Sequence, residues 1–191
     1  TDGTTVADRG CISAGTPISG INYIRDMVMT ASQAGTFILA DILWVNSGLV
    51  VTTTTAQTIT QPTLPLRATL GTSNGFGVGA GILVTTATTN AAAIATITLS
   101  YTNSEGVAGR TGTMSFPATA VIGTFVRFQL AQGDLGIRSI QSITLGTTLT
   151  AGAISLIAFN FLATVPVTVA NIGSIAFQRK LDLKLQNGHC L

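Results

Sequence analysis

Four glycines in the stretch LGTSNGFGVGAGILV, residues 70–84, are the first residues with a possible chemical role; they occupy positions 75, 77, 79 and 81. Glycine-rich loops ahead of helices bind phosphates because bare backbone N–H groups can approach a pyrophosphate. The motif G-x-G-x-x-G is not satisfied, since the sixth place counted from Gly77 is Ile82. A P-loop would need a lysine, and no lysine occurs before position 180. We therefore expect no nucleotide-binding loop.

The same glycines have two structural interpretations. Their period of two would place all four on one face of an extended strand, with Phe76, Val78 and Ala80 on the other. Such a bare face admits a neighbouring backbone or a bulky side chain, for example at a subunit contact. The alternative is a flexible loop that leads into a strand formed by ILVTTAT. The sequence leaves both interpretations open.

Nucleophilic catalysis needs a base beside the nucleophile, and the single histidine is His189, two residues before the end of the sequence. Residues at such positions are often mobile, so we expect a solvated His189 rather than a catalytic pair with Cys190. Cys11, Cys190 and one histidine cannot supply the four ligands of a structural zinc site. We expect both cysteines to be reduced thiols.

Paired carboxylates could act in glycoside hydrolysis. The available ones are Asp2, Asp8, Asp26, Asp41, Glu105, Asp134 and Asp182. Glu105 and Asp134 fall in predicted turns, where acidic side chains cap local N–H groups. The stretch QGDLG contains one carboxylate, too few for a calcium loop. We predict no catalytic, cofactor-binding or metal-binding residue, and no enzymatic activity.

The chain is poor in charge. Charged residues make up 8% of it and 32 residues are threonine, whereas an ordinary soluble domain has roughly 25% charged residues. An isolated monomer would have little electrostatic protection against association, so we expect a homo-oligomer whose subunits cover much of this surface. The net charge is only +2. The arginines at 67, 110, 127 and 138 are isolated and aromatic residues are few, which argues against a nucleic-acid partner.

A membrane span is not expected either. The most apolar run, AISLIAFNFLATVPV at 153–167, is shorter than the roughly 18 residues of a spanning helix and contains Asn160. It suits a buried strand better. No basic segment followed by an apolar one opens the sequence, so we expect a protein that is not exported by a secretory signal.

Three regions are predicted along the chain: an N-terminal arm at 1–35, a β domain at 36–167 and a C-terminal strand or tail at 168–191. Residues 1–18 contain almost no large apolar residue and suit an extended arm that becomes ordered against a neighbour. Ser19 as an N-cap, apolar residues at 21, 24 and 28, and Gly35 as a stop indicate one short helix. An irregular linker is the alternative. The tail contains IAFQRKLDLKLQ, an alternating strand that could pair with another subunit.

The β domain is predicted from short alternating segments separated by turns. In IATITLSY, for example, Ile97, Leu99 and Tyr101 share one face. The turn TNSEG leads to RTGTMSF, which would return antiparallel, and TFILADILWV would form a hairpin with LVVTTTTAQTIT through NSG. The other segments are TFVRFQL, IRSIQSITLG and GAISLIAFNFL, with AQGDLG as a further turn. This spacing predicts an all-β fold, an antiparallel sandwich or jelly roll.

Residues 43 to 160 resemble a group of structural proteins of tailed bacteriophages. The resemblance is carried in order by LWVNSGLVVTTTTAQTITQPTLPLR, by SYTN and GRT, then by FPATAV, FQL..GD.G, RSIQSITLG and AISLIAF. It implies a virion component assembled in the host bacterial cytoplasm, with a non-enzymatic role. Our first hypothesis is a capsid decoration, or cement, protein. Such proteins are β-rich, bind the major capsid protein on the outer shell as trimers, and clamp neighbours with terminal arms.

Two other roles stay open. A tail or connector component would form a ring. A head-fibre protein that binds a host-surface glycan would need aromatic rings on exposed loops, yet Tyr23, Trp44 and Tyr101 are the only rings besides phenylalanine.

Overall fold

The computed structural model describes residues 22–24, 27–61, 63–65, 68–70, 73–170, 174–176 and 183–185. All the elements named within these ranges are β-strands, which confirms the all-β prediction. The proposed arm at 1–18, Cys11, His189 and Cys190 lie outside the described residues.

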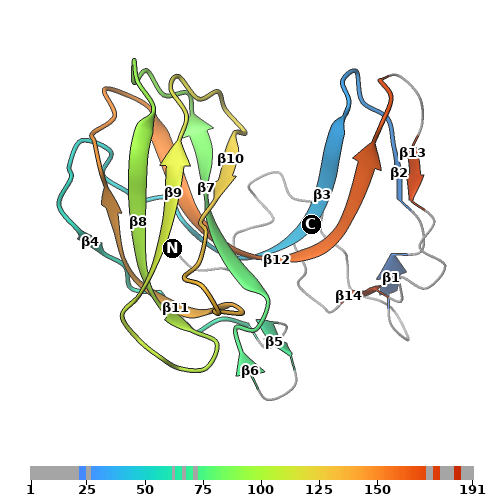
Figure 1. Ribbon diagram of the computed structural model, residues 1–191, viewed down its shortest axis with the longest axis horizontal. Helices are drawn as coiled ribbons and strands as arrows, with labels where there is room; N and C mark the ends of the chain where they lie inside the picture. The colour runs from blue at the N-terminus through green and yellow to red at the C-terminus, as the bar shows by residue number, and fades with distance from the viewer. Residues whose placement is uncertain are drawn as a thin grey trace. The chain divides into compact units, whose positions relative to one another are not determined.

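Eight strands form two antiparallel four-stranded sheets (Figure 1). The first has the order β10-β7-β12-β3 and the second the order β4-β11-β8-β9. The strands of the first sheet are β3 (Gly35–Asn46), β7 (Val78–Thr86), β10 (Phe125–Arg127) and β12 (Ala153–Val167). Those of the second are β4 (Gln57–Thr58), β8 (Ile94–Asn103), β9 (Arg110–Phe116) and β11 (Ile137–Leu145).

The strand order is that of a jelly roll. Numbered along the chain, the first, third, sixth and eighth of these strands share one sheet, and the second, fourth, fifth and seventh share the other. Successive connections therefore cross repeatedly between the two sheets, as in two interleaved Greek keys. The predicted sandwich is confirmed, and its connectivity is the jelly-roll alternative.

The core lies between the two sheets, where one side chain in two points inward. Ile97, Leu99 and Tyr101 of β8 are fully buried, as their alternation predicted. Val78, Ala80, Ile82 and Val84 of β7 belong to the same core cluster from the other sheet. Residues 154–159 of β12 are buried without alternation, so this apolar run is a strand covered on both faces, as expected.

The sequence predicted two hairpins between segments that are neighbours along the chain. The pairing of β8 with β9 through TNSEG is confirmed, with Tyr101 opposite Arg110. The hairpin predicted between the segments on either side of NSG is wrong, because β3 pairs with β12 and β4 with β11. The connection crosses from one sheet to the other. The Gln57 side chain holds this loop by accepting from Val50 N–H and donating to Val50 C=O, both at 2.8 Å.

The helix predicted near the N-terminus is also wrong for the residues described there. β1 (Asn22–Ile24) pairs with β14 (Leu183–Leu185), and β2 (Met27–Met29) pairs with β13 (Ser174–Ala176). Backbone partners supplied by segments about 150 residues away override the local helical spacing. The tail strands β13 and β14 thus have partners within their own chain.

The chain divides into two compact units. One contains Leu43–Asn160, and the other contains the described residues before Leu43 and after Asn160. β3 and β12 contribute residues to both units. A further pair of two-residue strands, β5 (Thr69–Leu70) and β6 (Ser73–Asn74), precedes β7 in the larger unit.

Of the four glycines in the stretch at 70–84, two lie in a turn and two lie in a strand, so each interpretation holds for one pair. Gly75 and Gly77 have positive φ angles of 82° and 78° and form a turn before β7. Gly79 and Gly81 lie within β7, where their bare face is covered by the rings of Phe159 and Phe125. These rings contact each other edge to face, with centroids 5.2 Å apart. The bulky groups accommodated by the strand glycines therefore belong to the same chain.

Replacing Gly79 by alanine is expected to destabilise the fold by about 1–3 kcal/mol, because the new Cβ would lie 2.8 Å from Cζ of the buried Phe159. Urea denaturation of Gly79→Ala, Phe159→Leu and the double variant measures this. The double variant should lose less stability than the two single losses combined. Gly35→Ala is the control, since no atom lies within 4 Å of its Cβ position. If the stability loss of the double variant equalled the sum of the two single losses, the contact between position 79 and the Phe159 ring would be contradicted.

Candidate functional site

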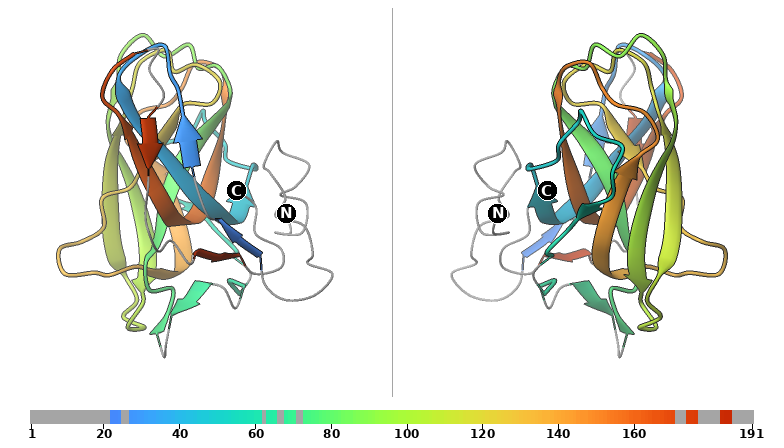
Figure 2. Two further views of the ribbon diagram at one scale, coloured as in Figure 1. Left: turned by 90° about the vertical axis from the view of Figure 1, so that its right-hand side faces the viewer. Right: turned by 90° about the vertical axis from the view of Figure 1, so that its left-hand side faces the viewer.

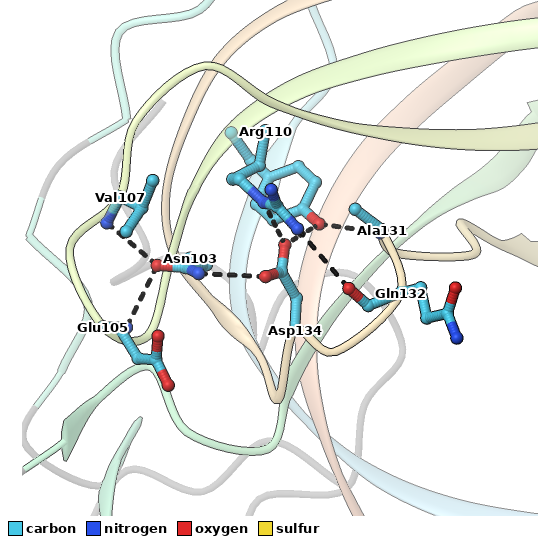
Figure 3. Close-up of polar contacts among 8 residues, drawn as sticks. Asn103, Glu105, Val107, Arg110, Ala131, Gln132 and Asp134 are labelled. Atoms are coloured by element: carbon cyan, nitrogen blue, oxygen red, sulfur yellow. Dashed lines mark hydrogen bonds and ion pairs between the residues drawn. The ribbon is translucent and has the colours of Figure 1, made fainter.

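A cluster of polar side chains lies where the β8–β9 hairpin meets the β10–β11 loop (Figure 3). Tyr101 and Asn103 come from the end of β8, Arg110 from the start of β9, and Asp134 from the loop. Tyr101 and Arg110 are direct partners in the β8–β9 ladder. We call these four residues the Asp134 cluster.

Asp134 is at the centre of the cluster. Its Oδ2 accepts hydrogen bonds from the Tyr101 hydroxyl at 2.5 Å and from Arg110 Nε at 2.9 Å. Its Oδ1 accepts from Asn103 Nδ2 at 2.9 Å. The Asp134 side chain is 4% exposed, whereas that of Arg110 is 35% exposed. The carboxylate is therefore surrounded by three donors, one of them cationic.

The electrostatics favour one fixed protonation state. The hydrogen bond from Arg110, with those from Tyr101 and Asn103, lowers the pKa of Asp134 to about 2 although burial opposes this. Burial, and then the hydrogen bond to Asp134, raises the pKa of Tyr101 to about 12. The hydrogen bond with Asp134 also raises the pKa of Arg110. Near neutral pH Asp134 is thus ionised and Tyr101 protonated, which does not suit either for general acid–base catalysis.

The remaining polar atoms of the cluster hold backbone. The Tyr101 hydroxyl accepts from Ala131 N–H at 2.9 Å, and Arg110 Nη2 donates to Gln132 C=O at 3.5 Å. Asn103 Oδ1 accepts from the N–H groups of Glu105 and Val107, at 3.1 and 2.9 Å, as an Asx turn does. Figure 3 shows these bonds reaching both loops. The Asp134 cluster therefore fixes two loops to each other.

The sequence interpretation of Asp134 needs correction. We expected Asp134 to cap N–H groups of its own turn, but its carboxylate accepts from three side chains of another hairpin. Asn103 instead caps the turn that contains Glu105. All four cluster residues fall within SYTN, GRT and GD.G, the segments that carry the resemblance. The usable signal was a tyrosine and an asparagine on the inward face of an alternating strand.

The described residues contain neither a metal-binding group nor a membrane-spanning helix. No three His, Cys, Asp or Glu residues there are grouped to hold a metal ion. In the same residues no helix is long and apolar enough to cross a bilayer. The smaller unit has a pocket of about 170 Å³ lined by Thr30, Ala31, Gln33, Gly35, Thr36, Phe37 and Val167. None of these side chains titrates, so the pocket offers no acid or base.

Comparison with known proteins identifies no relative: no family model matches the chain, and neither a curated protein nor a solved structure matches it.

Proposed function

We propose that this protein is a non-enzymatic structural component of a tailed-bacteriophage virion, and that it decorates the outer capsid surface and stabilises the head. The observation that carries the proposal is a sandwich surface poor in charge but rich in exposed aliphatic side chains. Val50, Val107, Val121, Ile122 and Leu135 are each at least half exposed. Such a surface is typical of a protein that other subunits cover.

The Asp134 cluster supports a structural role. Its carboxylate, hydroxyl and amide are hydrogen-bonded to each other and to the loop backbone, and the Asp134 side chain is almost completely buried. A rigid sandwich with loops fixed in this way can present a constant surface to a shell. Under this proposal the partner is the major capsid protein, and the protein is located in the virion as a homo-oligomer, with a trimer favoured.

A tail, connector or head-fibre component is the second candidate. Its glycan-binding form is disfavoured by the burial of Trp44 and Tyr101, at 2% and 0% exposure. These are the tryptophan and tyrosine side chains that the structure describes. The exposed rings among the described residues are phenylalanines, which have no polar group to donate to a sugar.

Quantitative mass spectrometry of purified particles tests where in the virion the protein is located. We expect several hundred copies per particle, counted against the major capsid protein in the same sample. A count of about six or twelve would instead match a ring of the tail or connector and would overturn the decoration role. Detachment of the protein with intact heads left behind, followed by a lower melting temperature of the heads, would support the stabilising role.

A further inference from the structure

Four loops at one end of the sandwich contain no charged residue. They are the connections at 47–56, 87–93, 117–124 and 146–152, and they consist mainly of threonine, alanine, glycine and aliphatic residues. In Figures 1 and 2 the green 87–93, yellow 117–124 and orange 146–152 loops gather at the top of the sandwich. We call the four loops the uncharged end.

Hydrogen bonds join these loops to each other. Thr88 and Ala120 exchange two bonds of 2.9 Å, one through the Thr88 backbone and one through its hydroxyl. Thr89 N–H donates to Ala151 C=O at 3.3 Å, and Leu149 N–H donates to Val51 C=O at 2.8 Å. All four loops are therefore parts of one connected surface.

The most exposed aliphatic pair of the described residues lies on this surface. Val121 and Ile122 are both 68% exposed, at the tip of the 117–124 loop. The bonds between Ala120 and Thr88 precede the tip, and Gly123 N–H donates to Val84 C=O at 2.9 Å after it. Hydrogen bonds hold the chain on both sides of the tip. Little conformational entropy would therefore be lost when the tip binds a partner.

Backbone strain occurs beside the same tip. Thr119 has a φ of 43°, the one positive value outside glycine among the described residues. A β-branched residue rarely adopts this strained conformation, and such strain is concentrated at binding sites. Thr119 N–H donates to Asn90 C=O at 3.1 Å, and Asn90 Nδ2 donates to Pro117 C=O at 3.2 Å. These bonds hold the strained residue in place.

The opposite end of the sandwich differs in charge. Glu105 and Asp134 lie in the loops there, with Arg110 at the start of β9 and Arg138 at the start of β11. In Figure 1 the β8–β9 and β10–β11 loops lie at the bottom of the sandwich, away from the uncharged end. A contact through the charged end would desolvate ionic groups, whereas one through the uncharged end would desolvate none.

We propose that the uncharged end binds a second copy of this chain, with Val121 and Ile122 at the centre of the contact. Two such ends facing each other bury aliphatic groups and hydroxyls, and place no like charges opposite each other. The size is also suitable, because about twenty residues of the four loops are exposed and a stable interface uses roughly 20–30 residues a side. This proposed contact between two copies does not depend on where in the virion the protein is located.

Analytical ultracentrifugation of the full chain over a concentration series tests this contact. We expect wild type to self-associate, and the Val121→Lys/Ile122→Lys variant to associate at least about tenfold more weakly, because four or more like charges would meet at the interface. Self-association of wild type should change little with ionic strength, since no charge pair is involved. The sedimenting mass gives the number of copies.

Val107→Lys is the matched control, since Val107 is a half-exposed valine at the charged end and its substitution should leave association unchanged. A Val121→Thr/Ile122→Thr variant adds no charge and should still weaken association; circular dichroism and melting temperature verify the fold of each variant. A monomeric wild type, or equal association of wild type and both tip variants, would overturn the proposal. If wild type is monomeric and the tip variants lose binding to undecorated heads, the uncharged end binds the shell instead.

Discussion

Replacing Asp134 by asparagine is expected to lower the free energy of unfolding by about 2–3 kcal/mol. The substitution keeps the shape of the side chain but removes the charge that Arg110 and the Tyr101 hydroxyl both contact. The buried hydroxyl then loses its strong acceptor, and a cation is left without its partner. The partial exposure of Arg110 keeps the loss below that of a fully buried pair. Urea denaturation followed by circular dichroism measures the change.

Glu105→Gln provides the control for removal of one negative charge. Glu105 is exposed in the adjacent turn, so its substitution should change stability by less than about 0.5 kcal/mol. Equal losses for Asp134→Asn and Glu105→Gln would show that net charge, rather than the Asp134 cluster, determines the effect.

The pH dependence of stability separates the ionic part of this effect. Asp134 has a lowered pKa of about 2 against an ordinary value of 3.8, so its contribution is complete above that ordinary value and is lost as the pH falls toward 2. The difference between wild type and Asp134→Asn should therefore narrow between about pH 5 and pH 2. Tyr101 has a raised pKa of about 12 against 10.0. Its contribution is complete below pH 10.0 and is lost as the pH rises toward 12.

Replacing Gly75 by alanine is expected to cost about 3–4 kcal/mol, the largest effect of any glycine substitution considered. Gly75 has a φ of 82°, which L side chains rarely adopt. A Cβ there would also meet the Ile137 carbonyl oxygen and lie 2.8 Å from Cα of Arg138. Both neighbours are backbone and cannot rotate away, so β11 or the turn must shift. Thermal and urea unfolding of the variant measure the loss.

Gly109→Ala is the matched control for Gly75→Ala. Gly109 has a similar φ of 72° but no atom within 4 Å of its Cβ position. It should show only the conformational cost of roughly 1–2 kcal/mol. The excess at Gly75 isolates the close approach of the two backbone segments. If the two substitutions were equally costly, the packing of the Gly75 turn against β11 would not contribute to stability.

The two substitutions act on the same part of the fold. Gly77 N–H donates to Leu135 C=O at 2.8 Å, and Phe76 forms a β-bridge with Gly136. The glycine turn therefore holds the residues that follow Asp134, while the Asp134 cluster holds the residues before it. Because both contacts fix one loop, losses in a double variant should fall short of the sum.

Predictions from the sequence were most successful for properties set within a single strand, such as which of its side chains are buried. Alternation in β8 identified its buried face, and the apolar run at 153–167 is a strand, of which residues 154–159 are buried as predicted. They were less successful where the partner is remote. The helical spacing near residue 24 gave no indication that β1 pairs with β14 (Leu183–Leu185), which lies about 160 residues away. After NSG the chain crosses to the other sheet, because β3 pairs with β12 and β4 pairs with β11. These partners are also remote in sequence.

By itself the sequence determined the all-β class, the inward faces of the central strands and the low charge of the surface, because side-chain alternation and composition are local properties. Only the tertiary structure decided that the sheets connect as a jelly roll, that Asp134 is bonded to the β8–β9 hairpin and that the uncharged loops form one end. The glycine stretch shows both limits: its period of two held for Gly79 and Gly81 in β7, while Gly75 and Gly77 became a turn. The physical reason is that a backbone partner such as β11 is brought close by the fold, and nothing near a glycine in sequence specifies it.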